Sequence, residues 1–208
     1  MRNLEFGTGE YYHVYNRGVD KRQTFIRPKD YQLFLSVIGR SKHDLRTGKH
    51  LVNVHAFACM PNHFHFLLEQ VCDDGISQFM QRLSTSYTRS FNHHYERTGS
   101  LFETTYKAKH INNDSYLATI ATYIHRNPIG LPGIKNLENL AYYPWSSFSH
   151  YSQSSQSLFL DDAMLFDFFG GPSGVKAFHE KDVSCLVDTF EEDEPTNYVR
   201  AKLSLALT

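Results

Sequence analysis

The 208-residue chain contains 41% hydrophobic residues, including 16 Phe and 13 Tyr, which is enough for one packed domain with a tail. No uninterrupted apolar segment approaches the roughly 20 residues that a transmembrane helix needs, and the N-terminal sequence MRNLEFGTGE lacks the apolar stretch of a signal peptide. The three cysteines form no close metal-type pair, which agrees with a reducing compartment. We therefore expect a soluble, cytoplasmic protein without a membrane partner.

Charge is distributed unevenly along the chain. Residues 1–150 contain 17 Lys and Arg against 12 Asp and Glu, whereas residues 151–208 contain 4 against 10, so the net charges are +5 and −6. This asymmetry fits polyanion binding by the body under the control of an acidic appendage, although a merely solvated surface is the more ordinary explanation. The polar run SQSSQS at 152–157 indicates the boundary. We predict a domain at 1–150 and an acidic tail with short helices at 151–208.

Periodicity predicts alternating strands and helices in the body. A β-type run at 11–18 is followed by a helical pattern at 29–39. The runs at 51–60 and 63–70 predict two neighbouring antiparallel strands, both central in a sheet. Residues 76–99 then show apolar side chains at spacings of three and four, which predicts a long amphipathic helix stopping at the terminal glycine.

The stretch MPNHFHFLLE at 60–69 places two histidines inside an otherwise apolar run. Because side chains alternate along a strand, His63 and His65 share one face while Phe64 and Phe66 point to the other. Two imidazoles one strand repeat apart can converge on one divalent ion. Hydrogen-bonded core histidines are the alternative, and a third ligand is needed to decide between the two.

A second candidate segment is DSYLATIATYIHRNP, which predicts a helix that starts at Asp114 and is ended by Pro128. Tyr123 and Asn127 are four residues apart, so they lie one turn from each other on the flank of its apolar stripe. A phenol and a carboxamide would then face the same space. On this helix alone, simple packing of the tyrosine ring is the favoured interpretation.

Four sequence blocks now carry a family resemblance. HVYNRG at 13–18, MPNHFHFLL at 60–68, YIHRNP at 123–128 and YPWSSF at 143–148 resemble, in order and spacing, the blocks of the single-tyrosine transposases with an HUH motif. These are encoded by the smallest insertion sequences and include the REP-associated tyrosine transposases. The resemblance covers nearly all of residues 10–150. It implies an α+β fold in which helices flank an antiparallel sheet, as in ferredoxin-like or RNA-recognition-like cores.

The resemblance also implies a mechanism and its residues. His63, His65 and Asn127 would bind a divalent metal, Mg²⁺ or Mn²⁺, and Tyr123 would be the nucleophile. The chain would cleave and rejoin single-stranded DNA, beside a DNA hairpin, through a 5′-phosphotyrosine intermediate. Some relatives have glutamine where this chain has Asn127. Monomer and homodimer both stay open.

Candidate DNA contacts follow from the same expectation. Tyr12, Tyr15 and Tyr106 are candidates for base stacking. The basic side chains expected to contact phosphate are Arg17, Lys21, Arg22, Arg82, Arg89 and Arg126. Surface arginines and buried tyrosines without such roles are the ordinary alternative at each position.

Two other functions compete with strand transfer. A non-catalytic or domesticated DNA-hairpin-binding protein would keep the same surface but would not cut. A metal-dependent hydrolase would use water at the histidine pair, and Tyr123 would then be dispensable. Formation of a covalent DNA adduct distinguishes strand transfer from both.

Overall fold

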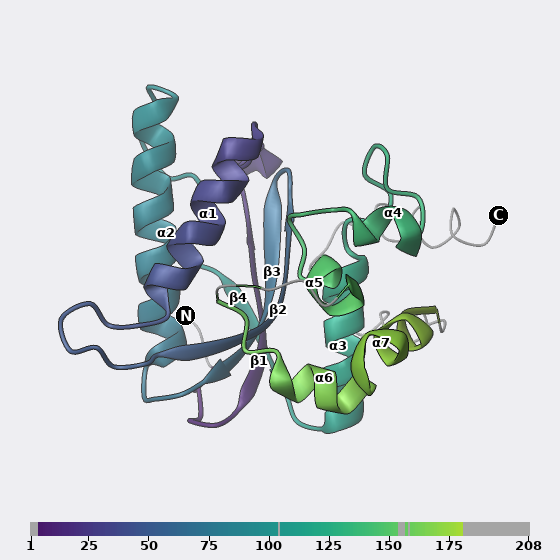
Figure 1. Cartoon of the computed structure of the whole chain (residues 1–208). Coiled ribbons are helices and arrows are strands. Elements are labelled where there is room, and N and C mark those ends of the chain that lie inside the picture. The colour runs from purple at the N-terminus through teal and green to yellow at the C-terminus, as the bar shows by residue number, and fades with distance from the viewer. Residues whose placement is uncertain (1–3, 104, 154–156, 158, 181–208) are drawn as a thin grey trace.

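In a computed structural model of the chain, residues 4–180 are described, except 104, 154–156 and 158 (Figure 1). The fold is α+β, as the sequence predicts, and its four strands form one antiparallel sheet in the order β2-β3-β1-β4. The elements in chain order are β1 (Tyr11–Arg17), the 3-10 helix η1 (Val19–Lys21), α1 (Pro28–Ser41), β2 (Val52–Met60), β3 (His63–Gln70), α2 (Gly75–His94), β4 (Lys107–Ile111), α3 (Asp114–Arg126), α4 (Leu137–Ala141), α5 (Phe148–Gln153), α6 (Ala163–Phe169) and α7 (Gly171–Glu180).

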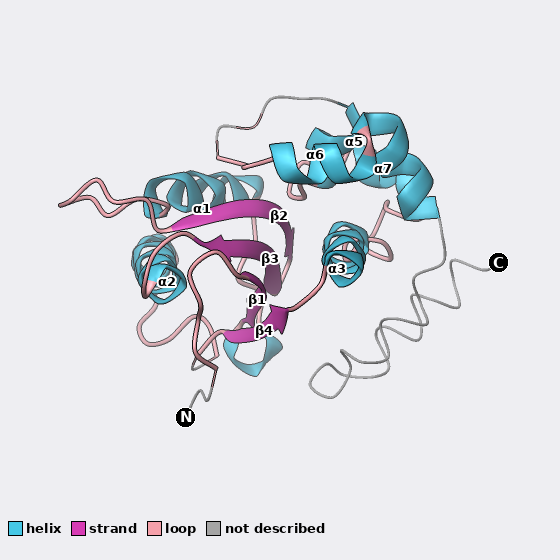
Figure 2. Cartoon of the chain, turned by 90° about the horizontal axis from the view of Figure 1, so that it is seen from below, coloured by secondary structure: helices cyan, strands magenta, loops and turns pink. Residues whose placement is uncertain are grey.

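Helices cover both faces of the sheet. Figure 2 shows α1 and α2 on one side of the strands and α3 on the other, with α5, α6 and α7 beside α3, toward the β2 edge of the sheet. Two groups of buried residues correspond to these two faces, one between the sheet and α1 with α2, the other between the sheet and α3. The sheet is therefore the middle of three layers, and both of its faces are buried.

The alternation along β3 is the one that its sequence predicts. Phe64 and Phe66 are fully buried on the α1 side, with ring centroids 5.1 and 6.2 Å from that of Phe34 in α1. His65 lies on the opposite face and is only 1% exposed. Burial of the phenylalanines thus fixes which face receives the histidines.

The 20-residue helix α2 buries the predicted stripe but ends earlier than the sequence suggested. Its last residue is His94, and Glu96 then adopts a left-handed backbone conformation (φ 51°), which the helix cannot include. The expected stop at Gly99 is therefore wrong by five residues. Among the described residues, no helix combines the length and the apolar character needed to cross a bilayer.

The position of β2 also differs from the expectation. We predicted that β2 and β3 are both central, but of these two only β3 is central, and β2 forms one edge of the sheet. Later parts of the chain cover this edge with backbone hydrogen bonds: Cys59 N–H to Trp145 O (2.8 Å), Ser147 N–H to Phe57 O (2.9 Å) and Asp161 N–H to Val54 O (2.9 Å). The sequence of β2 has the apolar composition of a central strand. The reason is that the later segments cover its edge, so that neither its two faces nor its edge is exposed to solvent.

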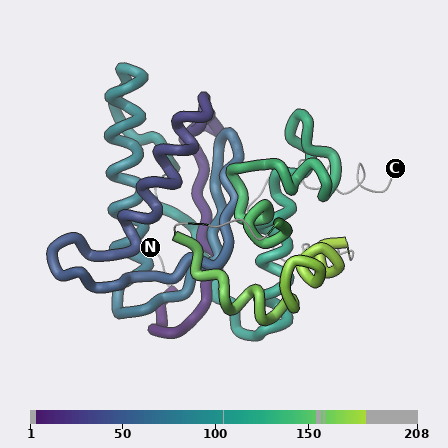
Figure 3. The backbone as a smooth tube through the Cα atoms, in the orientation of Figure 1, coloured from purple at the N-terminus to yellow at the C-terminus, as the bar shows by residue number. Residues whose placement is uncertain are grey.

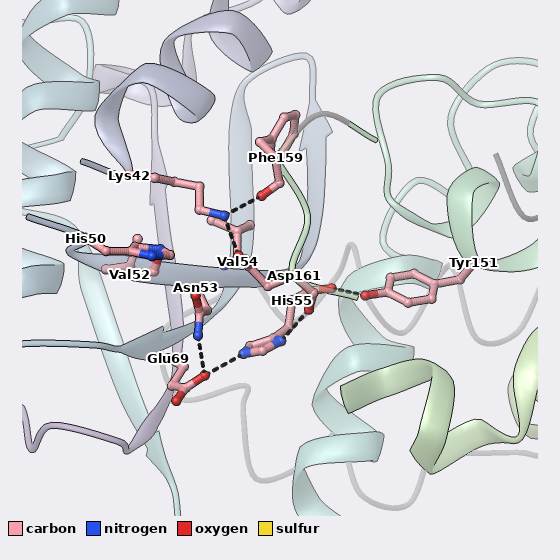
Figure 4. Close-up of polar contacts among 10 residues, drawn as sticks. All are labelled: Lys42, His50, Val52, Asn53, Val54, His55, Glu69, Tyr151, Phe159 and Asp161. Atoms are coloured by element: carbon pink, nitrogen blue, oxygen red, sulfur yellow. Dashed lines mark hydrogen bonds and ion pairs between the residues drawn. The ribbon is translucent and has the colours of Figure 1, made fainter. Parts of the chain in front are cut away.

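A buried ion pair holds the last of these segments in place (Figure 4). The Asp161 carboxylate accepts from the Lys42 ammonium (2.5 Å) and from Val54 N–H (2.7 Å), and Lys42 also donates to Phe159 O (2.9 Å). The His55 side chain contacts Asp161 O through Nδ1 (2.7 Å). Because the Lys42 side chain is only 8% exposed, loss of the carboxylate would leave a buried cation without its counterion.

The described part of the predicted tail packs against the body. The boundary that we placed after residue 150 falls inside α5, and Leu165, Phe169 and Val175 of α6 and α7 belong to the same buried group as α3. Figure 3 shows this segment, yellow-green, running beside the teal tube of α3. The acidic residues that follow Glu180 lie outside the described residues.

We expect Asp161→Ala to lower the free energy of unfolding by about 3 kcal/mol, because it removes both the Lys42 counterion and the acceptor for Val54 N–H. Lys42→Met should cost less, since the aliphatic stem stays and Asp161 can still be hydrated. Urea unfolding of each variant gives these differences. The matched control is Glu10→Gln, which weakens the exposed Glu10–His110 pair (2.8 Å) and should change stability by less than about 0.5 kcal/mol. Equal effects of Asp161→Ala and Glu10→Gln would contradict the role of the buried pair.

Candidate active site

Helix α3 lies across the sheet face that carries the histidines. Its buried stripe, Leu117, Ile120, Ala121 and Ile124, is the predicted one, and it packs with Leu67 of β3. Ala56 and Ala58 of β2 are fully buried in the same group. These small side chains let the helix backbone approach the strands closely, so side chains on the flank of α3 reach the sheet.

The histidine pair lies at the start of β3. The imidazole of His63 is half-buried, and its ring centroid lies 5.2 Å from that of His65 with the two planes nearly perpendicular (83°). His63 Nδ1 lies 2.6 Å from Asn62 Oδ1, and His65 Nδ1 lies 2.9 Å from His13 Nε2. Each ring thus contacts a side chain of the protein through Nδ1, and a ring with its hydrogen on Nδ1 has its lone pair on Nε2, where a cation can bind.

His13 is a site residue that the sequence argument did not assign. It lies on β1, is 2% exposed, and stacks on His65 with a centroid distance of 5.1 Å. Burial, with a smaller effect of the Lys109 charge, lowers its pKa to about 3, so the ring is neutral at neutral pH. The signal was present in HVYNRG, whose alternation puts His13 and Tyr15 on one face, but no sequence pattern gives the register with β3.

Tyr123 extends from α3 to this cluster. Its half-buried ring lies 5.7 Å from the centroid of His65 and 5.7 Å from that of His13, edge-on to both (90° and 80°). The tyrosine and the histidines belong to the same chain. A phenol hydroxyl beside two imidazoles in a partly exposed position is an arrangement in which a nucleophile can meet a substrate phosphate.

Asn127 follows the last turn of α3 as its C-cap residue, four positions after Tyr123. It is 9% exposed, and Pro128 prevents the helix from continuing. In the described part of the chain, no three His, Cys, Asp or Glu side chains converge as a metal cluster. A metal at the histidine pair would therefore need oxygen ligands of another kind, which a carboxamide and substrate phosphate provide.

A chain of buried hydrogen bonds anchors α3 next to Tyr123. His125 is fully buried, with Nδ1 2.9 Å from His179 Nε2 and Nε2 2.9 Å from the Ser147 hydroxyl. His179 Nδ1 in turn lies 2.7 Å from Val175 O, which can only accept. The Val175 carbonyl therefore requires the hydrogen on His179 Nδ1, and a neutral His179 then accepts from His125 at Nε2. The Ser147 hydroxyl lies within hydrogen-bond distance of both His125 Nε2 and Phe57 O (3.2 Å).

The predicted phosphate-binding residues lie in different places. Most of those near the sheet contact the protein itself: Arg17 pairs with Glu103 (2.5 Å), Arg22 with Asp20 (3.3 Å), and Arg126 donates to His179 O (3.1 Å). Lys21 is exposed at the end of η1. Arg82, paired with Asp44 (2.6 Å), and the exposed Arg89 belong to α2, on the side of the sheet away from Tyr123. The structure therefore does not gather the six into one surface.

The structure adds two lysines to the candidate DNA contacts and removes one tyrosine. Lys107 and Lys109 on β4 pair with Tyr15 and His13, so they lie on the histidine face of the sheet. The alternation in KAKHI carried this signal, but the strand was not predicted. Tyr12 is 2% exposed on the other face, so the suggestion that it stacks on a base is wrong.

On this fold, one strand of the sheet carries two histidines and the opposing helix carries a tyrosine. The family model described as "Transposase IS200 like" matches residues 10–127, more than half of the chain. The chain belongs to this family of transposases, whose members bind DNA and act in transposition and recombination.

Solved structures support the same fold. One of them, a REP-associated tyrosine transposase bound to a REP hairpin, is 13% identical in sequence with a TM-score of 0.56. The alignment covers 76% of this chain and 89% of that one. No curated protein matches this sequence.

The buried histidines of α3 and α7 make stability depend on pH. Burial, with a smaller effect of the Arg126 charge, lowers the pKa of His179 to about 4. Burial also lowers the pKa of His125 well below its usual value, and His179 and His150 add to that effect. The unfolded chain takes up protons below about pH 6.5 while the folded chain does not, so acid favours unfolding. We expect urea unfolding to show a loss of roughly 2 kcal/mol from His179 between pH 7.5 and pH 5, with a further loss from His125. His179→Leu should be less stable at pH 7.5 and less sensitive to acid; an unchanged wild-type stability at pH 5 would contradict the assignment.

Proposed function

We propose that this transposase cleaves and rejoins single-stranded DNA with Tyr123 as its nucleophile. The supporting observation is the position of the Tyr123 ring, 5.7 Å from the centroids of both His65 and His13 of the same chain. The phenol oxygen attacks the scissile phosphorus, the bond to the 3′ oxygen breaks, and that oxygen leaves as a hydroxyl after taking up a proton. The phenol proton passes to solvent or to a nearby base.

Rejoining is the reverse of the same step. The 5′ phosphate stays bound to Tyr123 as a phosphodiester, so the energy of the broken bond is retained. A 3′ hydroxyl of another strand attacks the phosphotyrosine, loses its proton and releases the phenol. Strand transfer therefore needs no nucleotide cofactor, and one site performs both steps.

His63, His65 and Asn127 are proposed to hold a divalent metal, Mg²⁺ or Mn²⁺. Both imidazoles use Nδ1 within the protein, which suits Nε2 for a cation, and the carboxamide supplies an oxygen. When bound, such an ion neutralises charge that develops on the phosphate. Nitrogen ligands suit Mn²⁺ better than Mg²⁺, so Mn²⁺ is the expected better activator.

The proposed substrate is a DNA single strand next to a hairpin. Support comes from the family and from the solved relative that is bound to a REP hairpin. Within this chain, Lys107 and Lys109 place positive charge on the histidine face, beside the proposed path of the backbone. Sequence specificity would then depend on base contacts outside the catalytic cluster.

Tyr123→Phe separates strand transfer from its alternatives. It keeps the ring that packs on the histidines and removes the attacking oxygen, so we expect hairpin binding to persist and cleavage to fall at least 10³-fold. Wild-type protein should form a DNA adduct that survives denaturing electrophoresis and maps to Tyr123. The matched control is Tyr116→Phe, two turns earlier on α3, which should cleave normally. Cleavage by Tyr123→Phe without an adduct would indicate a hydrolase; binding without cleavage by wild type would indicate a hairpin-binding protein.

Chelation should abolish cleavage and leave hairpin binding largely intact, because the metal serves the reaction and not the docking of the DNA. His63→Ala and His65→Ala should behave in the same way at saturating substrate. Cleavage and binding are measured on one labelled hairpin oligonucleotide, with EDTA and then with excess Mn²⁺ restored. Full activity of either variant in EDTA would remove the metal from the proposed mechanism.

A further inference from the structure

The two histidines of the proposed metal pair have one feature in common that the reaction itself does not require. Each contacts a side chain of the protein through Nδ1: His63 with Asn62 Oδ1 at 2.6 Å, and His65 with His13 Nε2 at 2.9 Å. The two partners come from different elements, one from the turn before β3 and the other from β1. The same atom is engaged in both rings, in different local surroundings.

These contacts select a tautomer. A neutral imidazole carries its hydrogen on one nitrogen and a lone pair on the other, and only the lone pair can bind a cation. An acceptor at Nδ1 keeps the hydrogen there and so keeps the lone pair at Nε2. Without such an acceptor the ring exchanges between tautomers and rotates more freely, and part of its population has a hydrogen where the cation should bind.

Asn62 is held with its acceptor toward His63. Its amide nitrogen donates to Lys21 O (3.2 Å), so Oδ1 is the atom left to face the imidazole. A carboxamide oxygen can only accept, and the contact therefore requires the hydrogen on His63 Nδ1. The turn residue thus specifies Nε2 of His63 as the ligand atom.

His13 contacts His65 from the neighbouring strand. In the β1–β3 register His13 is opposite Leu67 and His65 is opposite Tyr15, so the two histidines are diagonal neighbours on one face. Their rings are stacked (15° between planes), and Tyr15 stacks on both, with centroids 4.9 and 5.4 Å away. His13 Nε2 lies 2.9 Å from His65 Nδ1, so one of these two nitrogens carries the shared hydrogen; the proposal below places it on His65 Nδ1, with His13 Nε2 as the acceptor.

We propose that His13 and Asn62 are positioning residues that hold His65 and His63 in the Nδ1–H tautomer, with Nε2 directed to a divalent cation. The inference rests on the proposed metal site but concerns residues outside the ligand set. Neither residue touches the cation or the DNA in this scheme. Loss of either acceptor should weaken metal binding by roughly 10- to 100-fold while the ligands themselves stay in place.

The first experiment measures Mn²⁺ affinity, by electron paramagnetic resonance of the free ion, in the full chain without DNA. His13→Leu removes the acceptor and retains an apolar side chain, whereas His13→Gln places a carbonyl oxygen near the former Nε2. We expect a 10- to 100-fold loss for His13→Leu and a change of less than about threefold for His13→Gln. His110→Leu, a histidine on β4 that faces the other side of the sheet, should leave the affinity unchanged. Equal losses for Leu and Gln, in variants with equal thermal stability, would overturn the proposal and leave His13 a packing residue.

The second experiment observes the tautomers in metal-free protein by long-range ¹H–¹⁵N NMR of the histidine rings. Wild type should show His63 and His65 with the hydrogen on Nδ1, and His13→Leu should shift His65 alone toward a mixture. Asn62→Leu should do so for His63 alone. An Nε2–H tautomer in wild-type His65 would overturn the inference. If the wild type binds no Mn²⁺ but shows the expected tautomers, the proposed metal site fails while the positioning contacts stand.

Discussion

Side chains at successive positions of β3 point to opposite faces of the sheet, and the other elements are arranged around that alternation. Phe64 and Phe66 fill the space against α1, and their burial forces His63 and His65 toward α3. A shift of one residue in the strand would exchange the two sets and destroy both the core and the site. The apolar core and the histidine face therefore constrain each other, and neither could change its pattern alone.

Local periodicity explains what the sequence could predict. The two faces of β3, the buried stripe of α3 and the i, i+4 relation of Tyr123 and Asn127 all depend on residues close together in the chain, where geometry follows from spacing alone. The family resemblance then supplied roles for those side chains. The helix bounds were less certain, because the end of α2 is set by one left-handed residue, Glu96, which has no strong sequence signal.

Features that depend on long-range register were missed. His13 reaches His65 only because β1 pairs with β3 in a register that puts it opposite Leu67. Lys107 and Lys109 join the same face through a five-residue strand too short to show a clear period. The edge position of β2 could not be predicted for a related reason. Residues nearly a hundred positions later cover the edge of this strand, so its composition is that of a central strand.

The hydrogen bonds that cover β2 come from residues beyond the part of the chain that the family model matches. The family match ends at residue 127, yet Trp145, Ser147 and Asp161 supply partners for the backbone of β2, and His179 holds α3 through His125. A fragment cut where the match ends would present a bare strand rich in apolar side chains, able to pair with the same strand in other copies. Recombinant fragments intended to retain the transposase fold should therefore extend through α7, because the segments that protect β2 against intermolecular β-pairing follow the residues that the family model matches.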